Sequence, residues 1–76
     1  MPYNLYVTRP SGKTFKTLRS PYPTRGEIAA TVRTILAMGC PMTGEISEFA
    51  GGVVSAPLSQ TLTHETTGVG FRTEVA

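Results

Sequence analysis

The sequence has 76 residues, of which 39% are hydrophobic, and it carries a net charge of +2 and a single cysteine, Cys40. This length allows one domain over residues 1–76 and excludes a second hydrophobic core, and one cysteine excludes an internal disulfide. No apolar run reaches the roughly 18 residues that a membrane span needs, and the N-terminal residues lack the layout of a signal peptide. We therefore expect a cytoplasmic protein with no membrane partner.

Two β-strands joined by a tight turn are predicted at the start of the chain. In residues 3–8, apolar side chains alternate with polar ones, which is typical of a half-buried strand. Residues 9–13 predict a turn, because Pro10 fixes its own φ and Gly12 can adopt a positive φ. A second strand is expected to follow directly.

The length of the loop decides which side chains share a face of this hairpin. A three-residue loop places Val7 opposite Phe15 and Tyr6 opposite Lys16, whereas a two-residue loop pairs Tyr6 with Phe15 instead. We favour the three-residue loop, because it gathers the aliphatic side chains and Phe15 on one face of the hairpin.

A helix over residues 25–38 has the clearest periodic pattern in the chain. Residues 20–23 contain two prolines and predict an extended connector before it, since a residue that precedes proline is disfavoured in the helical conformation. Thr24 and Glu27 have the spacing of a capping box. Apolar residues then recur at helical spacing, and Gly39 marks the expected end of the helix.

A second, shorter helix is predicted after residue 43. Its apolar side chains recur at helical spacing and are Ile46, Phe49, Ala50, Val53 and Val54. Two consecutive glycines, Gly51 and Gly52, each cost a helix about 1 kcal/mol relative to alanine. We therefore expect a short or frayed helix that ends before Pro57, with a loop as the alternative.

The last part of the chain predicts a second hairpin. Residues 58–66 and 69–75 are rich in threonine and valine, and residues 67–68 form a candidate two-residue turn that places His64 opposite Phe71. One face of this hairpin would carry Leu62, His64, Val69, Phe71 and Val75. The predicted fold class is therefore α+β: an antiparallel sheet of about four strands in the order ββααββ, with one long and one short helix on one face.

No group of residues predicts an active site. Cys40, His64 and a glutamate could supply a nucleophile, a base and an orienting acid. However, Cys40 adjoins Pro41 at a helix end and His64 falls in a strand, so we interpret both as packing residues. His64 is the only histidine and there is no aspartate, which removes the zinc-ligand spacings and the commonest ligand of magnesium and calcium. We expect no catalytic residues, no metal site, no cofactor and no enzymatic activity.

The distribution of charge is the most informative feature of the composition. Residues 1–26 contain five cations and no acid, whereas residues 27–76 contain two cations and five acids, which gives a charge of +5 against −3. Such asymmetry steers a protein toward charged partners. The candidate partner-binding residues lie in or beside the first hairpin: Tyr6, Arg9, Lys13, Lys16 and Arg19.

Three interpretations of this basic segment are open. It can bind a protein or ribonucleoprotein complex, it can bind nucleic acid through phosphate contacts and base stacking, or its cations can simply protect an edge strand from aggregation. A helix-turn-helix is not expected, because the second helix carries Glu45 and Glu48 and no cation. The threonine-rich strands could also pair with a partner's sheet or with a second copy of the chain.

In size and architecture the sequence resembles the anti-CRISPR proteins, small inhibitors of bacterial defence that phages and mobile elements encode. The segments that carry the resemblance are the hairpin YNLYVTRPSGKTFKTL, the helix TRGEIAATVRTILAMG and the hairpin QTLTHETTGVGFRTEV. It implies a partner that is a guide-RNA-containing surveillance complex, which such an inhibitor would keep from binding DNA or recruiting a nuclease. Many of these inhibitors are acidic mimics of DNA, and the net charge of +2 departs from that pattern.

The leading expectation is a non-enzymatic inhibitor or adaptor that docks on a protein or ribonucleoprotein complex through its basic first hairpin. The alternative is a small nucleic-acid-binding protein that uses the same hairpin. Salt distinguishes the two, because binding to free oligonucleotides falls steeply as the salt concentration rises.

Overall fold

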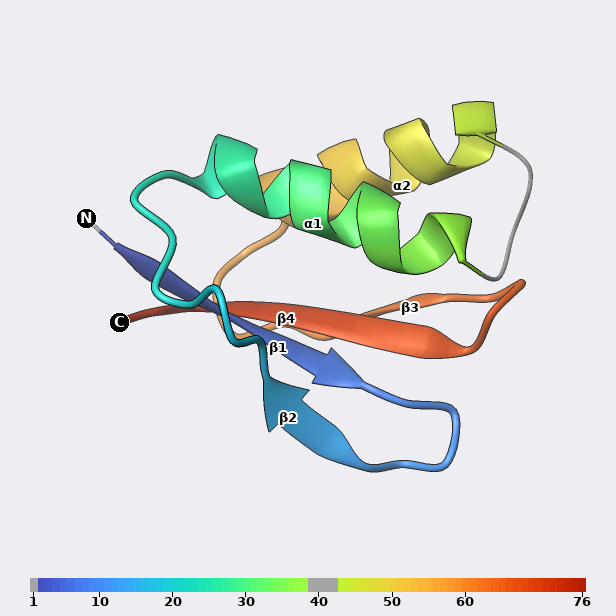
Figure 1. The fold of residues 1–76 in the computed structure, drawn as a ribbon, viewed down its shortest axis with the longest axis horizontal. Helices are drawn as coiled ribbons and strands as arrows, with labels where there is room; N and C mark the ends of the chain where they lie inside the picture. The colour runs from blue at the N-terminus through green and yellow to red at the C-terminus, as the bar shows by residue number, and fades with distance from the viewer. Residues whose placement is uncertain (1, 39–42) are drawn as a thin grey trace.

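The computed structural model describes residues 2–38 and 43–76, which form four strands and two helices. In chain order these are β1 (Tyr3–Thr8), β2 (Thr14–Lys16), α1 (Arg25–Ala37), α2 (Thr43–Ser55), β3 (Leu62–His64) and β4 (Val69–Val75). The predicted α+β fold and its ββααββ order are confirmed. Figure 1 shows both helices on one face of the sheet, while the opposite face is left open by the elements described.

The sheet is antiparallel, with the strand order β2-β1-β4-β3. β1 and β4 form its centre and pair from Tyr3 opposite Val75 to Thr8 opposite Gly70. Each of the other two strands is joined to a central strand by a hairpin, so β2 and β3 lie at the two edges. Because the first strand pairs with the last, both ends of the chain lie at the same end of the sheet (Figure 1).

The register of the first hairpin is the predicted one. Val7 lies opposite Phe15, and Tyr6 lies opposite Lys16. Gly12 closes the loop with a φ of +94°, a conformation that glycine adopts without the steric cost of a Cβ atom. The three-residue loop is therefore confirmed, and the two-residue alternative is excluded.

The register of the second hairpin differs from the prediction. His64 lies opposite Val69 instead of Phe71, so the loop spans residues 65–68 and is not a two-residue turn. Gly68, at a φ of +76°, donates its N–H to the His64 carbonyl at 2.7 Å, a bond that the shorter turn could not make. Because the register shift is two residues, each side chain still lies on its predicted face of the sheet.

The strand before this turn is shorter than predicted. β3 covers Leu62–His64 and not residues 58–66. Before it, Ser59 has a φ of 70°, and the Gln60 N–H donates to the Pro57 carbonyl at 3.3 Å. A left-handed residue and a turn cannot continue an extended strand, so pairing begins only after them.

The hydrophobic core lies between the sheet and the two helices. Its buried members are Leu5, Val7, Tyr22, Ile28, Val32, Leu36, Ile46, Ala50, Val53 and Phe71. Phe15 shares the face of the hairpin that carries Val7, as predicted, yet it is 39% exposed and is not among the buried residues. The reason is its position on β2, a three-residue strand at the edge of the sheet.

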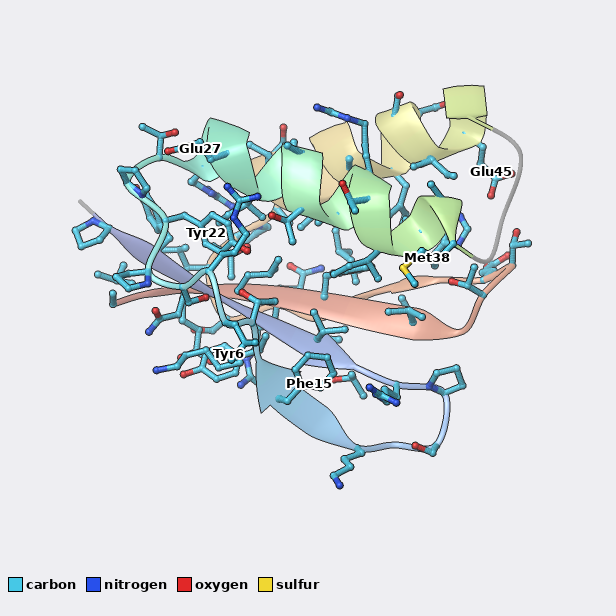
Figure 2. The ribbon with its side chains drawn as sticks, in the orientation of Figure 1. Tyr6, Phe15, Tyr22, Glu27, Met38 and Glu45 are labelled. Carbon is cyan, nitrogen blue, oxygen red and sulfur yellow. The ribbon has the colours of Figure 1, made fainter. Side chains whose placement is uncertain are left out.

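Tyr22 is a core residue that the sequence pattern did not indicate. It lies in the connector between β2 and α1, where it pairs with Tyr3 through backbone hydrogen bonds of 2.6 and 2.8 Å. It is 3% exposed, and its hydroxyl lies 3.1 Å from the Thr17 hydroxyl, so the polar end of a buried ring is satisfied. Figure 2 shows the Tyr22 ring between α1 and the sheet. The connector therefore adds an anchor to the core.

The start of α1 lies where it was predicted, but a capping box does not close it. Thr24 occupies the N-cap position with extended backbone angles, and its side chain makes no cap hydrogen bond. Thr24 and Glu27 are both exposed, so solvent can satisfy the free amides of the first turn. The predicted end of the helix at Gly39 lies outside the described residues.

α2 has 13 residues, the same number as α1, and is therefore longer than predicted. The expectation of a short or frayed helix was wrong, since Ile46, Ala50 and Val53 are buried against the core and tertiary packing outweighs the helix propensity of two glycines. Gly51 and Gly52 are exposed, and a Cβ atom added to either would have nothing within 4 Å.

Replacing both helical glycines with alanine is expected to stabilise the protein. Each substitution removes a propensity cost and meets no neighbour, so Gly51→Ala/Gly52→Ala should raise the free energy of unfolding by about 1.5–2 kcal/mol. Urea denaturation followed by circular dichroism measures the change. Gly68→Ala is the control, because its positive φ and a Pro10 side chain 3.3 Å away make the same substitution destabilising. A loss of stability in the double variant would contradict this placement of α2.

Candidate binding site

The four cations of the first hairpin region are exposed. We call these residues the basic hairpin cations, and the side chain of each is exposed to solvent: Arg9, Lys13, Lys16 and Arg19. Among the described residues, Glu45 lies beside His64 and Glu74 is paired with Arg72, and no carboxylate pairs with any of these four cations. Their charge is therefore not neutralised by any carboxylate that the structure describes.

The predicted site residues are distributed over both faces of the hairpin. Tyr6 and Lys16 lie opposite each other on the outer face of the sheet, and Figure 2 shows Tyr6 on the side away from the helices. Arg9 lies over the ring of Phe15 at 5.4 Å, and Phe15 shares the inner face with Val7. The hairpin thus presents cations on more than one side and does not form a single flat patch.

The outer face holds an aromatic ring that is already stacked. The guanidinium of Arg72 lies 4.7 Å from the centroid of the Tyr6 ring. Arg72 is held there by Glu74, whose carboxylate lies 2.6 Å from its Nε. Tyr6 is therefore part of an internal cation–π arrangement that covers one face of its ring.

Arg25, the fifth cation of the basic segment, has a structural position. Its guanidinium donates to the Ala56 carbonyl at 2.6 Å and lies 3.5 Å from the Val53 carbonyl. These carbonyls are at the C-terminal end of α2, where a cation stabilises the unpaired acceptors of a helix. Arg25 therefore joins the two helices and does not contribute to a binding surface.

An apolar groove of about 340 Å³ adjoins the basic hairpin cations. It lies between the first hairpin and the end of α1, and its lining includes Val7, Arg9, Phe15, Ile35, Met38 and Val69. Met38 is 86% exposed and Phe15 is 39% exposed. Sequence reasoning missed this groove, because it is formed by three segments that are far apart in the chain.

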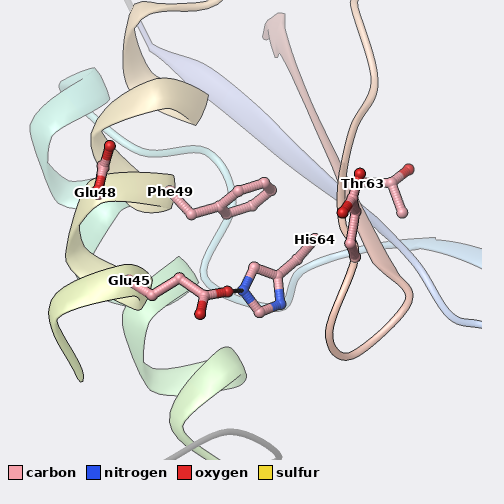
Figure 3. A pocket seen from close by; sticks show the side chains of 6 residues that line it. Glu45, Glu48, Phe49, Thr63 and His64 are labelled. Carbon is pink, nitrogen blue, oxygen red and sulfur yellow. Dashed lines mark hydrogen bonds and ion pairs between the residues drawn. The ribbon is translucent and has the colours of Figure 1, made fainter. Parts of the chain in front are cut away.

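A second hollow of about 430 Å³ lies at the other edge of the sheet. Glu45, Glu48 and Phe49 of α2 line it together with Thr63, His64 and Glu65. Figure 3 shows Glu45 reaching from α2 to the His64 ring. Three carboxylates make this hollow acidic, in contrast to the basic edge formed by β2.

Each of the two ring nitrogens of His64 has a hydrogen-bonding partner. Nε2 lies 2.9 Å from a carboxylate oxygen of Glu45, and Nδ1 lies 3.0 Å from the hydroxyl of Thr67. The ring also packs edge-on against Phe49, with the centroids 5.0 Å apart. These contacts tie β3 and its turn to α2, and they explain why the loop of the second hairpin has four residues.

A hydroxyl, an imidazole and a carboxylate in this order also occur in hydrolases. Here His64 is 2% exposed, and the carboxylates of Glu45, Glu48 and Glu65 around the hollow would oppose the negative charge that develops in acyl transfer. We therefore interpret the group as structural. Cys40, the candidate nucleophile, lies outside the described residues, and within those described no three metal-ligating side chains are grouped to hold an ion.

Comparison of the chain with protein families, with curated proteins and with solved structures found no match. Neither of the two described helices has the length and apolar composition to cross a membrane. The assignment of function therefore depends on the surface of the domain.

Proposed function

We propose that this protein is a non-enzymatic inhibitor or adaptor that docks on an acidic surface of a protein or ribonucleoprotein complex through the basic hairpin cations. The observation that carries the proposal is that Arg9, Lys13, Lys16 and Arg19 are exposed and unpaired with any described carboxylate. Cations that have no acid beside them keep their field available to a partner. Their position on and beside an edge strand leaves them open to approach.

A protein surface suits this hairpin better than free nucleic acid does. Stacking of bases requires open aromatic faces, but Arg72 already lies over one face of the Tyr6 ring on the outer face of the sheet. Arg72 is also paired with Glu74, so its charge is largely compensated before any phosphate approaches. Cations on both sides of a narrow ribbon fit a concave acidic surface, which contacts several sides at once.

The class of complex that we propose is a cytoplasmic guide-RNA-containing surveillance complex. The support is resemblance in type to the anti-CRISPR proteins, several of which combine a few-stranded antiparallel sheet with one or two helices in one small domain. The fold order ββααββ, with one open sheet face and a basic edge, provides such a surface. A net charge of +2 favours contact with an acidic subunit over mimicry of DNA.

The test compares two variants that have the same net charge. Lys13→Gln/Lys16→Gln and Arg33→Glu each lower the net charge from +2 to 0, the first at the hairpin and the second on the exposed face of α1. Tagged wild-type protein and both variants are used to capture partners from lysate of the native host, with and without nuclease treatment. Captured proteins are quantified by mass spectrometry.

We expect the wild type and Arg33→Glu to capture the same proteins, and the hairpin variant to lose them. If the two variants capture the partner equally well, the binding site does not depend on the basic hairpin cations and lies elsewhere on the surface. Direct binding of the wild type to a free duplex or single strand, with affinity that falls steeply between low and physiological salt, would favour the nucleic-acid alternative.

A further inference from the structure

The apolar groove beside the basic hairpin has the composition of a protein-binding surface. Met38 and Phe15 are two of the five large hydrophobic side chains that the described chain exposes, and both line this groove with the half-buried Ile35 and Val69. A small monomer gains nothing in stability from exposing such side chains together, and grouped exposed apolar residues mark interaction sites. Methionine is well suited to this role, because its flexible thioether adapts to different partner side chains.

The charge at the rim of the groove selects the partner. Arg9 lines the groove, its guanidinium is held 5.4 Å above the Phe15 ring, and it has no carboxylate partner among the described residues. A guanidinium that is already positioned by an aromatic ring loses little conformational entropy when it pairs with a carboxylate. Lys13 adds a second cation to the same end of the hairpin, since its carbonyl accepts the Arg9 N–H at 2.8 Å.

We infer that the groove binds an acidic segment of the partner protein that inserts one large apolar side chain between Phe15 and Met38 and places a carboxylate on Arg9. This inference rests on the proposed function and gives it a specific contact. The volume of about 340 Å³ accommodates a leucine or phenylalanine side chain. The apolar contact supplies affinity at the centre, and the charge at the rim supplies orientation and rate of association.

The probe is a short synthetic peptide with leucine and phenylalanine at its centre and glutamates on both sides. Two matched peptides replace either the apolar pair with serines or the glutamates with lysines. Affinity is measured by fluorescence polarisation, and the site is located from amide chemical shifts in NMR titrations. We expect the two matched peptides to bind at least about tenfold more weakly than the first.

The variants separate the apolar contact from the charge. Met38→Ser removes apolar surface from the groove and Leu58→Ser removes it from an exposed residue elsewhere. Arg9→Gln removes the rim charge, and Arg33→Gln removes an exposed cation on α1. We expect Met38→Ser and Arg9→Gln each to lower the affinity for the peptide by about tenfold. The two control variants should bind the peptide as the wild type does.

The possible failures are distinguishable. If Met38→Ser binds the peptide as the wild type does, or the serine peptide binds as well as the apolar one, the groove does not receive a side chain and the inference is wrong. Loss of partner capture by Lys13→Gln/Lys16→Gln would still support the proposed function in that case, because neither residue lines the groove. If every variant binds the peptide and captures the partner as well as the wild type does, both proposals are wrong.

Discussion

Replacing Phe71 with alanine is expected to remove a large part of the stability of the domain. Phe71 is 1% exposed and is the largest of the fully buried side chains described. It lies on β4, at the centre of the sheet, and its ring centroid is 5.9 Å from that of Phe49 on α2. Loss of such a side chain costs about 3–5 kcal/mol, whereas 76 residues at a typical stability per residue give about 4–11 kcal/mol in total.

Phe15→Ala is the matched control for this prediction. The same atoms are removed, but Phe15 is 39% exposed at the edge of the sheet, so we expect a loss below about 1.5 kcal/mol. Urea denaturation followed by circular dichroism gives both values. Equal losses would contradict the assignment of Phe71 to the core and Phe15 to the edge.

The features that the sequence predicts correctly are set by residues close together in the chain. Pro10 and Gly12 fix a three-residue loop, and this loop alone determines which residues of β1 and β2 face each other. The helical spacing of Ile28, Val32 and Leu36 likewise determines which face of α1 is buried. The same local reasoning locates the exposed cations, because a short hairpin has no interior in which to bury a charge.

The features that it misses depend on contacts between distant segments. Tyr22 is buried because its backbone pairs with Tyr3, which a connector rich in proline does not reveal. The register of the second hairpin depends on His64, whose partner Glu45 lies on a helix. Arg25 is counted with the basic segment by composition, although the fold directs it to the end of α2.

The groove was missed for the same reason, and the fold explains why it adjoins the cations. Pairing of β1 with β4 brings Val69 beside the first hairpin, and packing of α1 on the sheet brings Met38 to the same place. No local pattern in the sequence links these residues.

The strand order converts the charge asymmetry of the sequence into an asymmetry in space. The basic hairpin cations lie at the β2 edge, whereas the acidic hollow lies at the β3 edge, with both central strands between them. A domain that is polarised in this way is oriented by the field of a partner before contact. The acidic edge would also disfavour approach of the acidic partner that we propose from the wrong side.

Replacing His64 with alanine should destabilise the protein by about 2–4 kcal/mol while leaving partner capture intact at temperatures where the variant is folded. The substitution removes hydrogen bonds to Glu45 and Thr67 and the edge contact with Phe49, and it leaves a void beside α2. Urea denaturation measures the first effect, and the lysate capture described above measures the second.

Glu45→Gln separates the ring packing of His64 from its hydrogen bond. Glutamine keeps an acceptor oxygen near Nε2, and Glu45 is partly exposed, with 39% of its side chain accessible, so the expected loss is below about 1 kcal/mol. If the His64 ring serves only to join β3 to α2, the loss of stability is large for His64→Ala and small for Glu45→Gln. Neither variant should lose partner capture. If His64→Ala stayed as stable as the wild type but lost partner capture, His64 would belong to the binding site, and its assignment as a structural residue would be wrong.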